Sequence, residues 1–149
     1  FQKLFGEEMW ICVPPDHALA NSTAPVGIGD LAGETLLSLG SGHRLAFIVQ
    51  SLADQAGAFV SSEYEGNSLD ALRQMAAMGA GIAVLPSLYT LREARRDAGL
   101  CLRRINHPLA RREIALIWRE TSPLAESMTS LAETLSEVAT DLLASEREV

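Results

Sequence analysis

A glycine-bracketed loop followed by a histidine and an arginine gives the strongest chemical signal in the sequence. Residues 39–45 read LGSGHRL, between a strand-like segment and an amphipathic one. The N–H groups and the dipole at a helix N-terminus attract anions. Ser41 adds a hydroxyl, His43 a ring that donates or accepts, and Arg44 a planar fork suited to carboxylate. The loop is either a ligand site or a plain strand-to-helix turn. Its candidate ligand-binding residues are Ser41, Gly42, His43 and Arg44.

Two further strand-to-helix junctions repeat this arrangement. Asn67 and Ser68 precede a helical pattern that they could cap, and Leu85 and Pro86 close a short apolar strand. In a parallel sheet such loops meet at the carboxyl edge of the strands, where open α/β sheets bind ligands. We therefore add these four residues to the candidate ligand-binding set, with a simple helix cap as the alternative for the first two.

Catalytic and metal-binding chemistry has little support in the sequence. Neither GxSxG nor GxGxxG occurs, and no nucleophile pattern is recognisable. The histidines His17, His43 and His107 are far apart and lack the spacing of metal ligands. The sequence therefore predicts no catalytic residue, no metal site and no cofactor.

The composition is that of an acidic globular protein. Of the 149 residues, 48% are hydrophobic and 21% are charged, and the formal net charge is −7. Direct nucleic-acid binding needs clustered Lys and Arg, so this charge argues against it for this chain. No apolar run approaches the ~20 residues of a membrane helix and no signal peptide opens the sequence. We therefore expect a cytoplasmic protein without a membrane partner.

The two cysteines, Cys12 and Cys101, lie in apolar stretches far apart in the sequence. One possible pair, without a CxxC motif, is not the disulfide framework of a secreted domain. Buried reduced thiols are the simpler interpretation, and a redox role for either cysteine stays open.

Short apolar strands alternate with helical patterns along the chain, which predicts an α/β fold with a mainly parallel central sheet and flanking helices. Strands are predicted at residues 9–13, 35–39, 58–65, 82–85, 100–105 and 112–118, and helices at 43–56, 68–78, 87–96 and from 123 onward. In the last helix apolar residues alternate at steps of four and three, typical of a helix lying on a sheet. Met75 and Met78 in the second helix are either core residues or part of an adaptable interface.

Four segments together resemble the effector-binding domain of LysR-type transcriptional regulators. They read LFGEEMWICVPPDHALA, DLAGETLLSLGSGHRL, NSLDALRQMAAMGAGIAVLPS and SPLAESMTSLAETL, and they occur in the family's order. The resemblance covers most of residues 4–135 and is most characteristic at residues 67–86. It implies a Rossmann-like, periplasmic-binding-protein-like lobe that binds a small-molecule effector and is not an enzyme.

Within that family the resemblance points to the peroxide-sensing OxyR branch, in which a reactive cysteine follows Gly-His. A resolving cysteine follows nine residues later, and the matching positions here are Arg44 and Ala53. Both thiols are missing, and Cys12 and Cys101 do not replace them by position. The usual peroxide switch lacks its chemistry here, because the thiolate is the reacting species. Arg44 instead favours a small acid or anion as effector.

The resemblance also implies how the chain is organised. Residues 1–12 are expected to be a crossover strand from a first lobe that the chain omits, and residues 13–110 the second, effector-binding lobe. Residues 111–149 are expected to form a returning strand and a long helix that packs on the first lobe. The effector would lie between the lobes and shift the arrangement of lobes and subunits.

Partners follow from the same resemblance. A homodimer or tetramer is expected, with the helix at 68–78 packed on a partner subunit. Its interface residues would be Leu69, Leu72, Met75 and Met78. DNA would be bound only through an N-terminal helix-turn-helix absent from this chain. The alternatives are a solute-binding protein lobe of a transporter, a dehydratase-like enzyme, and an oxidative-stress sensor with non-standard chemistry.

Overall fold

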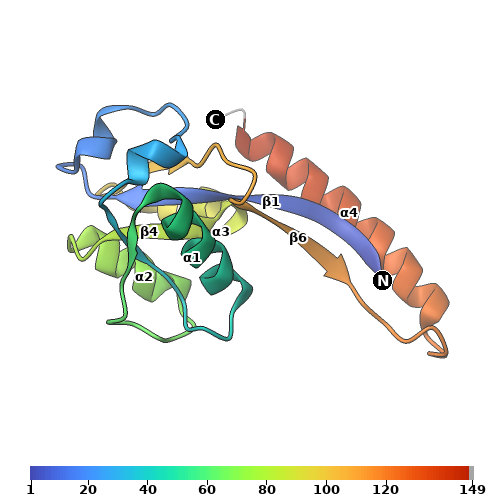
Figure 1. The fold of residues 1–149 in the computed structure, drawn as a ribbon. Coiled ribbons are helices and arrows are strands. Elements are labelled where there is room, and N and C mark those ends of the chain that lie inside the picture. The colour runs from blue at the N-terminus through green and yellow to red at the C-terminus, as the bar shows by residue number, and fades with distance from the viewer. Residues whose placement is uncertain (148–149) are drawn as a thin grey trace. The chain divides into compact units, whose positions relative to one another are not determined.

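The computed structural model describes residues 1–147, and it divides into two units (Figure 1). The larger unit is Glu8–Arg111, and the smaller unit combines Phe1–Glu7 with the chain from Arg112 onward. The long strand β1 (Gln2–Val13) contributes residues to both.

The larger unit is built on a mixed sheet with the strand order β3-β2-β4-β1-β5. β2 (Thr35–Leu37) pairs in parallel with β3 (Phe59–Val60) and with β4 (Ile82–Pro86). β1 pairs antiparallel with β4 and with β5 (Cys101–Arg104). The predicted α/β class is confirmed. The parallel pairing is confined to β2, β3 and β4, because these are the strands that helical crossovers connect.

Two helices connect the parallel strands. α1 (Arg44–Ala56) leads from β2 to β3, and α2 (Leu69–Ala77) leads from β3 to β4. Gly57 ends α1 in the left-handed conformation at φ 71°, which glycine adopts without strain. Ser68 caps α2, because its hydroxyl accepts a hydrogen bond from the Ala71 N–H at 3.2 Å. Both helix boundaries are close to those predicted from the sequence.

Two apolar cores lie on the two faces of the sheet, since side chains alternate along each strand. Leu36 belongs to the first core, which α1 covers with Leu45 and Ile48. Leu37, the next residue of β2, belongs to the second core, which α2 covers with Leu72. The sheet is therefore covered on both faces.

Several predicted elements differ in length. β1 begins at Gln2, although the sequence predicted a strand only over residues 9–13. β3 is only two residues long, although the sequence predicted a strand over residues 58–65. Beyond it, the Ser61 hydroxyl accepts from the Glu63 N–H at 3.3 Å, and this local turn competes with strand pairing. The helix predicted at 87–96 is divided into α3 (Ser87–Arg92) and a 3-10 turn (Ala94–Arg96), a common tightening at a helix end.

The smaller unit combines the first part of β1 with β6 (Arg111–Leu116) and α4 (Ala125–Arg147). β6 pairs with β1, and α4 runs beside β1, where the Ser136 hydroxyl donates to the Leu4 carbonyl at 2.7 Å (Figure 1). The buried residues of α4 include Ala132 and Ala139. Leu131, Leu135 and Val138 are exposed, whereas Met128, Leu142 and Leu143 are half-buried. No helix in the part of the chain that the structure describes is long and apolar enough to cross a membrane.

Candidate functional site

A cavity of about 460 Å³ lies beside the first half of α1. Its walls come from the β2–α1 loop, from α1 and from the segment after β3. The lining residues are Ser38, Leu39, Gly40, Ser41, Ala46, Phe47, Gln50, Val60, Ser61, Ser62, Tyr64 and Glu65. The volume is within the range of roughly 300–1,000 Å³ that is usual for small-molecule sites. The cavity lies at the carboxyl ends of β2 and β3, the edge at which open α/β sheets bind ligands.

The two loops of the cavity meet at Gly40. Its N–H donates to the Gly66 carbonyl at 2.9 Å. A Cβ atom at Gly40 would lie 2.5 Å from the carbonyl oxygen of Glu65, closer than real Cβ atoms come to any neighbour. Glycine is therefore required here by close backbone approach, not merely preferred in a turn.

Tyr64 fixes the segment that follows β3. Its hydroxyl accepts a hydrogen bond from the Ser68 N–H at 3.1 Å, which ties the tyrosine to the start of α2. The same ring lies against Gly66, where a side chain would collide with it. The cavity wall is thus held by both the β2–α1 loop and the beginning of α2.

Ser38 gives the cavity a polar group without a partner. The residue is 4% exposed, and its hydroxyl is buried without a hydrogen bond. Leaving a buried hydroxyl unsatisfied costs on the order of 1–3 kcal/mol, so such a group marks a place where a ligand or an ordered water would bind. Sequence reasoning missed Ser38, because it reads as part of an apolar strand. The signal was a polar residue at the carboxyl end of that strand.

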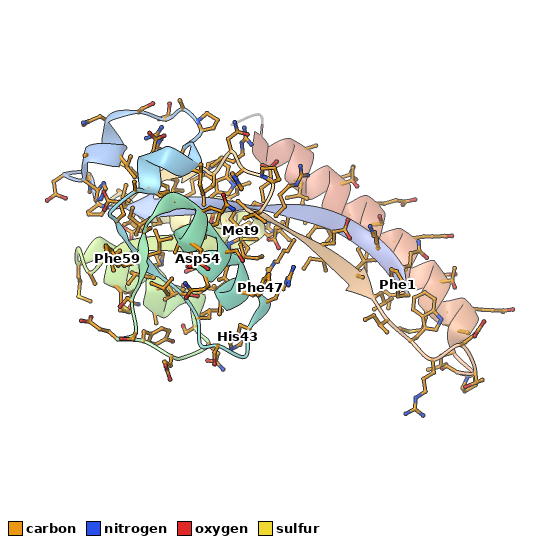
Figure 2. The ribbon with its side chains drawn as sticks, viewed as in Figure 1. Phe1, Met9, His43, Phe47, Asp54 and Phe59 are labelled. Carbon is orange, nitrogen blue, oxygen red and sulfur yellow. The ribbon has the colours of Figure 1, made fainter. Side chains whose placement is uncertain are left out.

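The residues predicted to bind a ligand at the first loop lie at or next to the cavity. Ser41 lines it, whereas Gly42, His43 and Arg44 are exposed at the start of α1. The His43 side chain makes no capping hydrogen bond, and Figure 2 shows it at the same end of α1 as Phe47. The Arg44 guanidinium carbon lies 4.6 Å from the centre of the Phe47 ring, a cation–π contact, and Phe47 lines the cavity.

The other predicted ligand-binding residues lie outside the cavity lining. Asn67 is exposed, and Ser68 serves as the cap of α2. Leu85 and Pro86 are buried in β4, where they pair with β1. The cavity joins the first predicted loop to residues 60–65, a stretch that the sequence assigned to a strand.

The residues predicted for a subunit interface on α2 differ in exposure. Met78 is 78% exposed, whereas Leu69 and Met75 are half-buried against the core. Leu72 is fully buried inside the larger unit and offers no side-chain surface to a partner. The exposed part of this face is its carboxyl end.

A polar cluster ties α2 to the segment after β4. Arg73 donates to the Asp97 carboxylate at 2.7 Å and to the Tyr89 hydroxyl at 3.3 Å. The Tyr89 hydroxyl donates in turn to Asp70. Burial, followed by this hydrogen bond to Asp70, raises the pKa of Tyr89 to about 12. The cluster positions α2 and lies outside the cavity.

The two cysteines lie on neighbouring strands but on opposite faces of the sheet. Cys12 pairs with Leu102 and Cys101 pairs with Val13, so the thiols point into different cores. A disulfide would require their Cβ atoms to face each other. Burial, followed by the nearby carboxylate of Asp97, raises the pKa of Cys12 to about 12, which leaves little thiolate at neutral pH.

We expect iodoacetamide to leave Cys12 unmodified in the folded chain at pH 8, because Cys12 is fully buried and its thiol is protonated. Cys101 is partly exposed and should react first. Peptide mass spectrometry before and after unfolding in guanidinium measures both sites. Fast modification of Cys12 in the folded chain would contradict this assignment.

Comparison with known proteins matches residues 1–140 to the family described as LysR substrate binding domain. The chain is 41% identical over 134 residues to a hydrogen peroxide-inducible genes activator of Pectobacterium carotovorum subsp. carotovorum, covering 90% of this chain and 44% of that protein. It is 39% identical over 132 residues to the DNA-binding transcriptional dual regulator OxyR of Escherichia coli (strain K12), covering 89% of this chain and 43% of that protein.

The fold gives the same result. A crystal structure of the oxidized form of OxyR matches with a TM-score of 0.75 and 37% identity, covering 91% of this chain and 63% of that one. The chain spans less than half the length of the two relatives named above. The resemblance in the sequence is confirmed: this chain belongs to the LysR substrate-binding domain family and is similar within it to the OxyR hydrogen peroxide-inducible activators.

Proposed function

We propose that this chain is the effector-sensing part of a LysR-type DNA-binding transcriptional regulator, and that the cavity beside α1 holds part of its small ligand. Proteins of this family are transcription regulators and not enzymes. The observation that carries the proposal is Ser38, a residue of the cavity lining whose buried hydroxyl has no hydrogen-bond partner among the described residues. A ligand that supplies that partner would stabilise the lobe.

The proposed effector has an acid or anionic group that binds at the start of α1. Arg44 is exposed, and its guanidinium makes a cation–π contact with the Phe47 ring. The first turn of α1 also lacks a side-chain cap. The guanidinium and these N–H groups together supply donors for a carboxylate. By the resemblance in the sequence, Arg44 matches the position of the reactive cysteine in the OxyR branch, so we propose an anion-binding residue at a position that is redox-active there.

The remaining parts of the proposal concern the first lobe, the partner subunits and DNA. The smaller unit would complete a first lobe, because α4 leaves Leu131, Leu135 and Val138 exposed. The effector would then lie between two lobes, in a cytoplasmic homodimer or tetramer that contacts DNA through an N-terminal helix-turn-helix. Met75 and Met78 would contact a partner subunit. Effector binding would shift the population between two arrangements of subunits.

We expect small organic acids to raise the melting temperature of the two-lobed regulatory domain and Arg44→Ala to remove most of that shift. Hydrogen bonds to a charged group contribute about 1.5–3 kcal/mol, so the variant should bind at least about tenfold more weakly. A thermal-shift screen of mono- and dicarboxylates, followed by titration calorimetry, measures this effect.

The matched control for the acid screen is Arg92→Ala. Arg92 is an exposed arginine on α3 that does not line the cavity, so its removal changes the net charge equally. It should leave acid binding unchanged. Undiminished binding of a carboxylate in Arg44→Ala would rule out the anion clamp.

A further inference from the structure

The wall of the cavity carries one sign of charge. Among its lining residues Glu65 is the one with a charged side chain, and Glu63 lies two positions before it in the same exposed segment. Neither lysine nor arginine belongs to the lining. A carboxylate seated inside the cavity would be repelled by Glu65, whereas an ammonium group would be attracted. The interior of the cavity thus favours a positively charged group, whereas the start of α1 favours a negatively charged one.

The uncharged polar groups of the lining can accept hydrogen bonds from a ligand. Gln50 uses one amide N–H on the Asp54 carboxylate at 3.0 Å. The Ser38 hydroxyl is buried without a hydrogen bond, and Ser41 adds an exposed hydroxyl to the lining; both oxygens can accept. An ammonium group brings three donors, which these oxygens can accept. Because the hydroxyls can also donate, the preference for an amine over an acid comes from Glu65.

Two aromatic rings supply the apolar part of the wall. Phe47 is 61% exposed, an unusual state for a phenylalanine, and Tyr64 is fixed through its hydroxyl by Ser68. An apolar ligand body would cover the Phe47 ring and remove it from water. Aromatic faces also attract organic cations, as the contact of Arg44 with Phe47 illustrates.

We infer that the cavity beside α1 binds the ammonium group of a small amine with an apolar body. This inference rests on the proposed function, because both place a ligand in the same cavity. The inference adds the chemical class of the ligand. An effector that reaches both Arg44 and Glu65 carries an acid group and an amine group. Glu65 is the residue that selects the amine, and Ser38 supplies a buried acceptor.

The test compares three probes that share one apolar body and differ in charge. They are 2-phenylethylamine, 2-phenylethanol and 3-phenylpropionate, titrated into the chain with binding followed by nitrogen–proton NMR. The amine should bind more tightly than the alcohol and shift resonances of residues 38–41 and 60–65. Glu65→Gln should weaken amine binding about 1.5- to fivefold, the range for an exposed ion pair, and leave the alcohol unchanged.

Two further variants separate charge from structure. Glu63→Gln removes a neighbouring exposed carboxylate that does not line the cavity, and it should leave amine affinity unchanged. Ser38→Ala should weaken amine binding and also raise the stability of the free chain, because it removes a buried hydroxyl that has no partner. If Ser38 had only a structural role, Ser38→Ala would lower both the amine affinity and the stability of the free chain.

The outcomes distinguish this inference from the proposed function. Amine affinity that is equal in the parent chain and in Glu65→Gln overturns the inference, as does amine binding that shifts no resonance at residues 38–41 and 60–65. Amine binding that depends on Glu65 supports it, even where the acid screen on Arg44 fails. Acid binding that depends on Arg44 without any amine binding supports the proposed function and overturns the amine site.

Discussion

Replacing Gly40 with alanine is expected to lower the free energy of unfolding by about 1–3 kcal/mol, the usual cost of forcing an atom into a packed site. The new Cβ would lie 2.5 Å from the carbonyl oxygen of Glu65 and 3.2 Å from its carbonyl carbon. Both atoms belong to the backbone, so no side-chain rotation relieves the contact. The two loops must separate instead, and the hydrogen bond from the Gly40 N–H to the Gly66 carbonyl lengthens or breaks.

The loops that would separate are the two walls of the cavity, so ligand binding should fall together with stability. Urea denaturation followed by circular dichroism measures the stability change. Hydrogen exchange over residues 61–68 reports whether the damage is local. A folded Gly40→Ala variant that still bound the amine or acid probes as tightly as the parent chain would contradict the assignment of Gly40 as the link between the walls.

Gly42 provides the matched control in the same loop. A Cβ there meets no atom within 4 Å, so Gly42→Ala should change stability by no more than about 0.5 kcal/mol. Similar losses in both variants would mean that general loop flexibility, and not close backbone approach at Gly40, governs this region.

These two glycines show where sequence reasoning succeeds and where it ends. Local patterns placed α1 and α2 well, because helical periodicity, the stop at Gly57 and the cap at Ser68 are each set by neighbours in the chain. The LGSGHRL loop was also placed correctly at the carboxyl end of a strand. What distinguishes Gly40 from Gly42 is the approach of Glu65, a residue distant in sequence, and no local pattern contains that information.

The cavity itself could not be predicted for the same reason. Part of its wall lies at residues 60–65, which the sequence pattern predicts as a strand, although β3 ends at Val60. Ser38 looked like part of a buried strand, and its missing partner is a property of three-dimensional packing. Leu85 and Pro86 differ from Ser38. They lie at the predicted carboxyl end of β4, but pairing with β1 buries them.

Arg103→Met is expected to destabilise the larger unit by at least about 1.5–3 kcal/mol, the contribution of hydrogen bonds made by a charged group. Arg103 is only 8% exposed and donates to the carbonyl oxygens of Ala24 at 2.6 Å and Leu19 at 3.0 Å. It thereby helps to anchor the turn-rich connection between β1 and β2, together with the backbone pairing of Val26 with Ile105. Methionine keeps much of the volume but leaves these carbonyls without their donor.

A substitution of the neighbouring Arg104 is the control that removes a positive charge without removing the hydrogen bonds to the connection. Arg104 pairs with Glu8 at 3.6 Å with its side chain 36% exposed, so Arg104→Met should cost about 0–1 kcal/mol. Arg103→Lys adds a second comparison, because it keeps the positive charge but replaces a rigid fork by a single point of attachment. Since Arg103 reaches more than one carbonyl, lysine should recover only part of the loss in urea denaturation. Full recovery by lysine would mean that the positive charge, and not the geometry of the fork, anchors the connection.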